Sequence, residues 1–334
     1  MRTALCDLLG IELPIVQAPM GGAANPALAA AVSNAGGLGM LALSWHPLEA
    51  VRGEIRATRA LTEKPFGVNL VLEWPQAERL AVCLEEGVPV ISFFWGDPAP
   101  LTASAHAGGA KVMCTVASAE QARHAVAAGV DVVVAQGWEA GGHVLGEVAT
   151  LPLVPAVVDA VKPTPVVAAG GIADGRGLAA ALALGAAGAW IGTRFLATPE
   201  AGIHPDYRAR LLAAAETATV HTSLFDGGWP NAPHRVLRNS TYDAWAAAGR
   251  PASGERPGEG EVLASTARGG IRRYASATPG PDAEGDIEAA SLWAGQGAAQ
   301  VKTTKPAAEI VREIVADAER VVAGLAGRTE PACA

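Results

Sequence analysis

The clearest candidate for chemistry is a histidine in a glycine-rich stretch. His143 ends the stretch QGWEAGGH, which begins at Gln136, the last residue of the β-branched run DVVVAQ. Imidazole exchanges protons near neutral pH because its ordinary pKa is about 6.5. We therefore predict that His143 is an active-site general base or hydrogen-bond donor, with a pKa within about one unit of that value.

Glycines also gather directly after two other β-branched runs. Gly170 and Gly171 follow PVVAA, and Gly192 and Thr193 follow GAWI. Such glycines can simply make tight turns, but they also let an anion approach backbone N–H groups. In parallel α/β barrels the loops after the seventh and eighth strands commonly bind a phosphate. We therefore predict a phosphate site at these two loops.

Two polar residues stand out within apolar runs. Asn69 lies inside FGVNLVL, where a buried amide needs either a backbone partner or a ligand. Lys111 opens KVMCTV, and it is either an ordinary solvated lysine or a cation close to a ligand's ring atoms or phosphate. No GxGxxG follows the first run and no GxxxxGK[ST] occurs, so the sequence supports neither a Rossmann dinucleotide site nor a P-loop.

Eight short apolar runs would have to position these residues. Between them lie alanine-rich segments with helical periodicity, many of which end in glycine. Regular alternation of strand and helix predicts a parallel sheet, and eight strands fit a closed TIM (β/α)8 barrel. The runs cover Pro14–Pro19, Gly37–Leu43, Phe66–Leu72, Pro89–Phe94, Lys111–Val116, Asp131–Gln136, Pro165–Gly170 and Gly188–Thr193.

The alternation stops after Phe195. Residues 210–285 are rich in Gly, Pro, Trp and Arg, and we interpret them as an inserted cap between two barrel segments, 1–209 and 286–334. In the cap, Trp229, His234 and Trp245 are candidates for a substrate-facing surface. A final amphipathic helix, PAAEIVREIVADAERVVAGL, would complete the barrel with one apolar face formed by Ile310, Ile314, Val321 and Leu325.

Composition excludes several classes of protein. The chain has 334 residues, 50% of them hydrophobic and 17% charged, so it should fold into a globular protein. A net charge of -8 argues against a nucleic-acid partner. Four cysteines without a CxxC pair indicate neither zinc nor a disulfide framework, and we expect no metal site. The first residues lack signal-peptide features and no apolar run is long enough for a membrane, so we expect a cytoplasmic protein.

The motifs taken in order resemble the nitronate monooxygenase family, once called 2-nitropropane dioxygenases. They are QAPMGG, NAGGLGML, FGVNL, QGWEAGGH, AAGGIADG, IGTRF and AGQG, and the similarity covers Leu5–Thr198 and Ile287–Gly324. The resemblance implies an FMN-containing TIM barrel with a cap, and it implies that His143 is the active-site histidine. The flavin contacts that it implies are Pro19, Met20, Gly21, Asn69, Lys111, Gln136, Gly141, Gly142, Ala169, Gly170, Gly171, Gly192, Thr193 and Gln296.

The resemblance also implies a reaction. A nitronate or nitroalkane would be oxidised with FMN and O2 to a carbonyl compound and nitrite. A homodimer is one assembly that the enzyme could form. An NAD(P)H-dependent FMN reductase of quinones or enoyl thioesters is the alternative, and a flavin-binding protein without turnover is a third hypothesis. Val71 and the sequence HVLG after the glycines depart from the family pattern, and they leave the substrate open.

Overall fold

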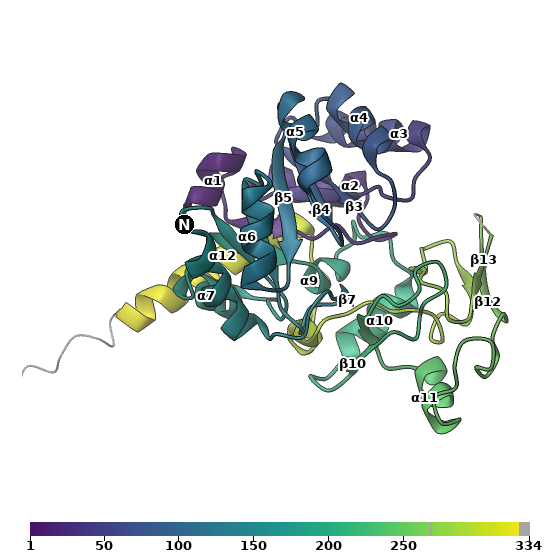
Figure 1. The fold of residues 1–334 in the computed structure, drawn as a ribbon. Helices are drawn as coiled ribbons and strands as arrows, with labels where there is room; N and C mark the ends of the chain where they lie inside the picture. The colour runs from purple at the N-terminus through teal and green to yellow at the C-terminus, as the bar shows by residue number, and fades with distance from the viewer. Residues whose placement is uncertain (268, 327–334) are drawn as a thin grey trace, which may run out of the picture.

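A computed structural model of the protein describes residues 1–267 and 269–326 (Figure 1). The predicted frayed tail RTEPACA, with Cys333, lies outside the described residues. Eight parallel strands form one sheet in the order β1-β9-β8-β6-β5-β4-β3-β2. Their bounds are β1 Ile15–Gln17, β2 Gly39–Ala42, β3 Phe66–Val71, β4 Val90–Phe94, β5 Lys111–Val116, β6 Val132–Gln136, β8 Val166–Ala169 and β9 Gly188–Ile191.

The two ends of this sheet meet. A parallel bridge joins Val16 to Leu38, the residue before β2, and the N–H of Leu38 donates to the carbonyl of Ile15 at 2.9 Å. The sheet therefore curls into a nearly closed barrel, and the prediction of a TIM-type α/β fold is confirmed. Helix α1 (Ala4–Leu9) covers the amino-terminal end of the barrel, where Leu5 and Cys6 are fully buried in the cluster that fills the interior.

Helices surround the strands, and side-chain caps fix the start of several of them. Asn25, Ser118 and Asp174 each accept hydrogen bonds from N–H groups in the first turn of the helix that follows. The helices are α2 Pro26–Asn34, α3 Leu48–Leu61, α4 Ala77–Glu85, α5 Ala99–Ala107, α6 Ala119–Ala127, α7 Thr150–Val161, α8 Gly175–Ala183, α9 Thr193–Leu196 and α12 Ala307–Ala326.

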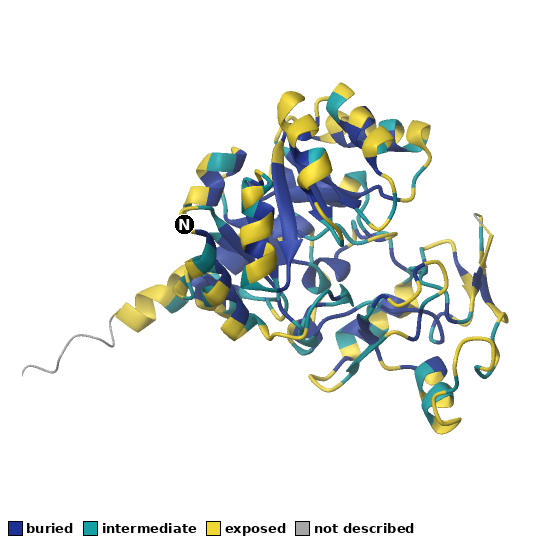
Figure 2. Cartoon of the chain, viewed as in Figure 1, coloured by how far each residue is buried: buried dark blue, intermediate teal, exposed yellow. Residues whose placement is uncertain are grey.

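Helix α12 takes the last place in the helical layer, between α8 and α2. Its predicted apolar face is confirmed at Ile310 and Ile314, which are buried. Leu325 is exposed, because the helix extends beyond its neighbours at that end (Figure 2). In the same view buried residues line the strands, while exposed residues lie on the outer faces of the helices.

The segment between α9 and α12 lies at the carboxyl end of the strands (Figure 1). Strand β7 (Gly142–His143), in the loop after β6, pairs antiparallel with β11 of this segment, so barrel and cap share one small sheet. The segment contains α10 Pro205–Ala213, β10 Thr219–Thr222, β11 His234–Leu237, α11 Ser240–Ala247, β12 Val262–Thr266, β13 Gly269–Arg272, β14 Glu284–Gly285 and the 3₁₀ helix η1 Gln296–Gln300.

One buried cluster links this segment to its flanks. Tyr207 and Leu211 of α10 pack with Leu263, Ile271 and Leu292, on both sides of the predicted limits 210 and 285. None of the helices in the described ranges is sufficiently long and apolar to cross a bilayer. The described residues also hold no group of three or more potential metal ligands among His, Cys, Asp and Glu.

Candidate functional site

His143 is fixed in space by both the barrel and the cap. Its residue pairs with His234 across the β7·β11 ladder. From the end of β6, the Gln136 amide donates to the carbonyl of His143 at 3.0 Å and accepts from the N–H of Leu145 at 3.2 Å. The Gln136 side-chain amide therefore holds the loop that carries the imidazole at two points, His143 and Leu145.

Aromatic rings enclose the His143 imidazole. Trp229 stacks on one face, with ring centroids 4.0 Å apart and planes 30° apart, and Trp293 lies at 5.3 Å with planes at 34°. Trp95 and His234 present their rings nearly edge-on, at 6.1 Å and 5.5 Å. The Nε2 atom of His143 is buried and has no hydrogen-bond partner among the described residues. A buried polar atom normally has a hydrogen-bond partner, so this atom is able to bind a group on a ligand.

Burial changes the acid–base chemistry of this histidine. Desolvation, with a smaller contribution from neighbouring His234, lowers the pKa of His143 to about 3. The prediction of a pKa within one unit of 6.5 is wrong, because a charged imidazole would lose its hydration among the indole rings. His143 is consequently neutral at physiological pH.

His234 supports the site from the cap. Its Nδ1 lies 2.9 Å from the carbonyl of Ala232, and its Nε2 accepts from the N–H of Phe225 at 3.2 Å. These partners fix the neutral tautomer with the proton on Nδ1, and burial lowers the pKa of His234 to about 4. Both ring nitrogens are engaged in protein contacts, so His234 positions the cap loop and does not present a free group to a substrate.

The two glycine-rich loops carry free backbone donors. Gly170 and Gly171 have φ values of 110° and 70°, a region that favours glycine. No acceptor within the described chain takes the N–H groups of Gly170, Gly171 or Gly192. Unpaired N–H groups on consecutive loops at strand ends are a suitable donor set for a phosphate. The residues present therefore fit the phosphate of a flavin.

Further loops converge on the same place. Thr193 Oγ1 accepts from the N–H of Gly295 at 3.0 Å, and the N–H of Gln296 donates to the carbonyl of Glu139 at 2.9 Å. A Cβ on Gly141 would lie 2.4 Å from the nitrogen of Gly295, so only glycine permits this approach. The structure thus brings the loops after β6 and β9 together with η1.

The loop after β1 completes the ring of loops. The Met20 side chain lies beside Gly192, where a Cβ would be 3.7 Å from the Met20 sulfur, and Thr278 of the cap segment donates to the carbonyl of Gly21 at 2.6 Å. Pro19 precedes them in the same loop, and Ala169 ends β8 beside the glycine pair.

Asn69 lies within the barrel. Val68 and Leu70 belong to the cluster between strands and helices, so Asn69 between them faces the interior. The Asn69 residue is 5% exposed, and its side-chain amide has no hydrogen-bond partner in the part of the chain that the structure describes. The amide is therefore available to a ligand at the carboxyl end of the barrel.

Comparison with known proteins identifies the family to which the chain belongs. The family model described as nitronate monooxygenase matches residues 2–79 and 73–317. The chain belongs to the nitronate monooxygenase family. It is 36% identical over 363 residues to a nitronate monooxygenase of Pseudomonas aeruginosa, a match that covers 94% of this chain and 99% of that protein. The family assignment makes the chain an oxidoreductase.

Two further comparisons broaden the view of this family member. A dehydrogenase of Mycobacterium tuberculosis, named for a hydroxy-methyl-oxo-octahydro-indene-carboxyl-CoA substrate, is 44% identical over 246 residues, which are 73% of this chain and 68% of that enzyme. The solved structure of FabK from Thermotoga maritima has a TM-score of 0.83 and 38% identity, with 98% of this chain and 99% of that chain covered. This member of the nitronate monooxygenase family therefore shares its fold with FabK.

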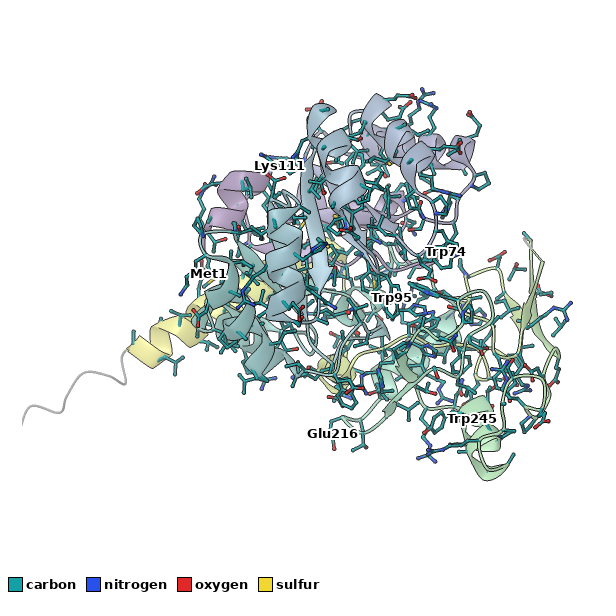
Figure 3. The ribbon with its side chains drawn as sticks, viewed as in Figure 1. Met1, Trp74, Trp95, Lys111, Glu216 and Trp245 are labelled. Atoms are coloured by element: carbon teal, nitrogen blue, oxygen red, sulfur yellow. The ribbon has the colours of Figure 1, made fainter. Side chains whose placement is uncertain are left out.

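Lys111 does not join the site. It is the first residue of β5, at the amino-terminal end of the barrel, where its exposed ammonium lies 3.3 Å from the carboxylate of Asp131. Figure 3 shows Lys111 on the far side of the barrel from Trp74 and Trp95. The first residue of a parallel strand lies a full strand length from the carboxyl-end loops, so we correct the expectation that Lys111 contacts the flavin.

Sequence reasoning found some aromatic residues of the site and missed others. Trp229, one candidate for a substrate-facing residue, lies beside His143. Trp245, another candidate, packs against Tyr242 and donates to the carbonyl of Pro251, and Figure 3 shows it in the cap, apart from Trp95. Trp45, Trp74 and Trp293 were missed. Trp45 and Trp74 each stand three residues after a strand, and that spacing was the available signal.

Arg235 is a further residue that supports the site, and no motif in the sequence indicated its role. Its guanidinium is buried, donates to the carbonyl of Trp138 at 2.9 Å and lies 4.2 Å from the centroid of the Trp138 ring. Burial lowers the pKa of Arg235, although Glu139 opposes that shift. The contact joins β11 to the loop between β6 and His143, so Arg235 helps to hold that loop, and with it His143, in place.

Proposed function

We propose that this oxidoreductase is an FMN-dependent nitronate monooxygenase, which oxidises alkyl nitronates, and nitroalkanes that ionise to them, with O2 to a carbonyl compound and nitrite. The observation that carries the proposal is the buried Nε2 of His143 at the carboxyl end of the barrel, which has no hydrogen-bond partner within residues 1–267 and 269–326. His143 and the glycines whose N–H groups are free all follow barrel strands, namely β6, β8 and β9, at the carboxyl end of the sheet. The family assignment supports the same conclusion.

The hydrogen-bond donors that have no partner in the described chain indicate which residues would hold FMN. The N–H groups of Gly170, Gly171 and Gly192 would bind its phosphate, and the Asn69 amide would contact its ring. When bound, the flavin accepts electrons from the substrate and passes them to O2. The other proposed contacts are Pro19, Met20, Gly21, Gln136, Gly141, Gly142, Ala169, Thr193 and Gln296.

His143 acts on the nitro group as a neutral imidazole. Its pKa of about 3 makes it a weak base toward the Cα proton of a neutral nitroalkane, since each unit of pKa mismatch costs about 1.4 kcal/mol. A neutral imidazole N–H still donates a hydrogen bond to a nitronate oxygen. The surrounding rings exclude water, which strengthens that bond. We therefore propose that His143 binds a preformed nitronate and does not generate it.

An NAD(P)H-dependent reductase of quinones or enoyl thioesters is the second candidate. A specific observation favours it, because a relative named as a dehydrogenase of a CoA thioester is 44% identical to this chain. The same loops would hold FMN, and a nicotinamide would reach the flavin face without a Rossmann site. The difference between the two functions lies in the electron donor.

One experiment separates these functions. The purified yellow protein is mixed anaerobically with ethylnitronate, then in separate samples with NADH and NADPH, while the flavin absorbance is followed; mass spectrometry of the released cofactor identifies FMN. Bleaching by ethylnitronate and slow or no bleaching by the nicotinamides is expected. Bleaching by a nicotinamide alone would establish the reductase, and bleaching by none of the three would leave a flavin-binding protein without turnover.

The proposal includes the organisation of the chain. We place the FMN-binding barrel at residues 1–209 and 286–334 and the substrate-selecting cap at 210–285. A net charge of -8 supports small-molecule substrates in preference to nucleic acid. A cytoplasmic location and a homodimer complete the proposal, and sedimentation of the purified protein tests the assembly.

A further inference from the structure

Trp229 is the centre of a group of aromatic rings, which we name the Trp229 cluster. Its outer members are Trp45, Trp74, Phe94 and Trp95, from the ends of β2, β3 and β4. The ring centroid of Trp229 lies 6.1 Å from that of Trp45, 4.9 Å from Trp74, 6.5 Å from Phe94 and 5.1 Å from Trp95. The barrel thus supplies four rings and the cap supplies the one between them.

The Trp229 indole occupies the space against His143. Trp229 is 4% exposed, whereas Trp45 at the outer edge of the cluster is 48% exposed. With its centroid 4.0 Å from that of the imidazole, the indole covers one face of His143. A substrate that contacts this face has to take the place of the indole, and it then meets the remaining rings of the cluster.

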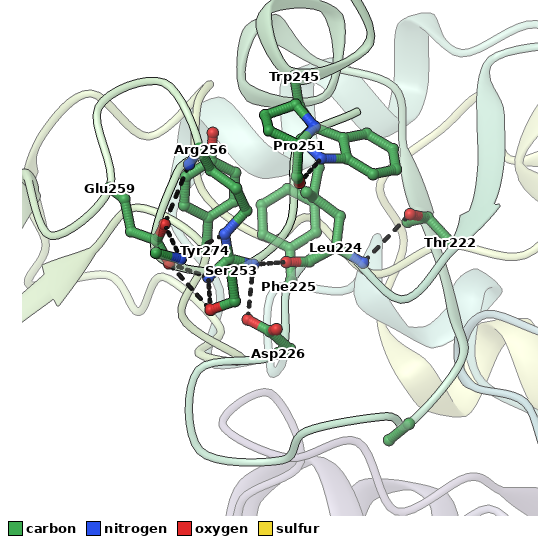
Figure 4. Close-up of polar contacts among 12 residues, drawn as sticks. Thr222, Leu224, Phe225, Asp226, Trp245, Pro251, Ser253, Arg256, Glu259 and Tyr274 are labelled. Atoms are coloured by element: carbon green, nitrogen blue, oxygen red, sulfur yellow. Dashed lines mark hydrogen bonds and ion pairs between the residues drawn. The ribbon is translucent and has the colours of Figure 1, made fainter. Parts of the chain in front are cut away.

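The loop that carries Trp229 is clamped on one side of the residue (Figure 4). Arg256 donates to the carbonyl of Leu224 at 3.1 Å and to the carboxylate of Asp226 at 2.8 Å. Gly228 follows with φ 97°, and a Cβ built on it would meet nothing within 4 Å. The backbone N–H of Trp229 donates to the carbonyl of Asp226 at 3.0 Å, so the backbone at Trp229 is held while its side chain can still rotate.

We propose that the Trp229 cluster makes the enzyme selective for nitronates that carry a flat apolar group, such as an aryl ring, in preference to short alkyl nitronates. The inference rests on the proposed nitronate oxidation and adds its substrate class. Aromatic rings attract one another beyond the effect of the buried area alone. Displacing the indole loses contacts with several rings, and a flat ring on the substrate restores them while a methyl group does not.

Steady-state kinetics test the proposal. The nitronates of 2-phenylnitroethane and nitroethane are compared at equal flavin content. The wild type should show a kcat/KM at least tenfold higher for the aryl substrate. Trp74→Leu, which removes the barrel ring nearest to the place of the indole, should reduce the ratio to below threefold, and Trp74→Phe, which keeps a ring, should retain it. Trp245→Leu is the matched control, because this cap tryptophan packs on Tyr242, and its ratio should stay at the wild-type value.

Equilibrium binding separates this inference from the proposed function. Phenylacetate and acetate each carry a planar carboxylate that resembles the nitronate group but cannot react, and quenching of tryptophan fluorescence reports their affinity. Phenylacetate should bind the wild type at least tenfold more tightly, with the difference lost in Trp74→Leu. If no nitronate is turned over but this difference is seen, the proposed function fails and the aromatic preference stands. Equal affinities for the two anions, or equal kcat/KM values for the two nitronates, would overturn the inference.

Discussion

The imidazole of His143 and the indole of Trp229 lie face to face, with 4.0 Å between their centroids and 30° between their planes. One ring comes from a barrel loop and the other from the cap, and the β7·β11 ladder brings them together. The stack removes His143 from water, and this burial lowers its pKa to about 3. The chemistry of the histidine is therefore decided jointly by barrel and cap.

Replacing the histidine tests its role in binding the nitronate. His143→Asn should lower kcat/KM for ethylnitronate about ten- to a hundredfold, because a hydrogen bond to a charged group contributes roughly 1.5 to 3 kcal/mol. His106→Asn is the control, since this exposed residue pairs with Asp131 at the opposite end of the barrel and should have full activity. A loss confined to neutral nitroalkanes, with ethylnitronate unaffected, would instead make His143 a base.

The pH dependence of activity follows from the lowered pKa. Since His143 stays neutral in the folded protein down to about pH 3, kcat/KM for a preformed nitronate should show no histidine limb between pH 7 and pH 5. Measurements with ethylnitronate in buffers of constant ionic strength check this. A limb centred near pH 6.5 would contradict the enclosed, neutral imidazole.

The same pKa makes a prediction about stability. Between pH 6.5 and about pH 3 the unfolded chain binds a proton at His143 that the folded chain does not, so stability should fall as pH falls, by about 1.4 kcal/mol per unit for a fully shifted histidine. Urea unfolding at pH 7, 6 and 5 measures the slope. In His143→Gln the slope should be smaller, and an unchanged slope would show that His143 titrates normally.

A single methyl group tests the phosphate site. In Gly192→Ala the new Cβ would lie 3.5 Å from the Cβ of Ala18 and 3.7 Å from the Met20 sulfur, ordinary contacts that the fold tolerates. The variant should therefore melt like the wild type yet bind at least tenfold less FMN, because the methyl group blocks approach to the free N–H. Gly53→Ala, where the added Cβ meets nothing, should keep full flavin content. Full occupancy in Gly192→Ala would place the phosphate elsewhere.

The clamp on the Trp229 loop should be measurable as stability. The Arg256 side chain is 7% exposed and bridges the Asp226 and Glu259 carboxylates, so Arg256→Met leaves two partly buried charges unpaired. We expect the free energy of unfolding to fall by about 2 kcal/mol and acrylamide to quench tryptophan fluorescence more strongly. Arg176→Met, which removes an exposed pair with Asp174, should change neither measurement. Equal effects in both variants would mean that Arg256 does not hold the loop.

Much of the fold could be predicted because its signals are local. The run FGVNLVL contains β3. Ser118 and Asp174 cap helices, and Ser and Asp are residue types that favour the first position of a helix. Glycine after a strand is equally readable, and Gly170 and Gly171 have the positive φ values for which glycine is needed. Parallel strands bring their carboxyl ends to one side, so the meeting of these loops followed from strand order alone.

Other features depended on contacts between distant segments. The strand position of Lys111 could be read from the sequence, but its pairing with Asp131 at the amino end was visible only in the structure. Trp293 gave no signal, because its place beside His143 depends on how the cap folds back. The pKa of His143 was mispredicted for the same reason, since a motif does not show how many rings will surround it.

The sequence by itself determined the strand–helix alternation, the glycine loops at the strand ends and the presence of one histidine among them, because these depend on residue type and short-range spacing. Only the tertiary structure decided that His143 is neutral, that its Nε2 has no partner among the residues that the structure describes and that Trp229 covers its ring. Desolvation and ring stacking arise from segments far apart in the chain. Their strength depends on distances of a few ångströms, which no local pattern of residues encodes.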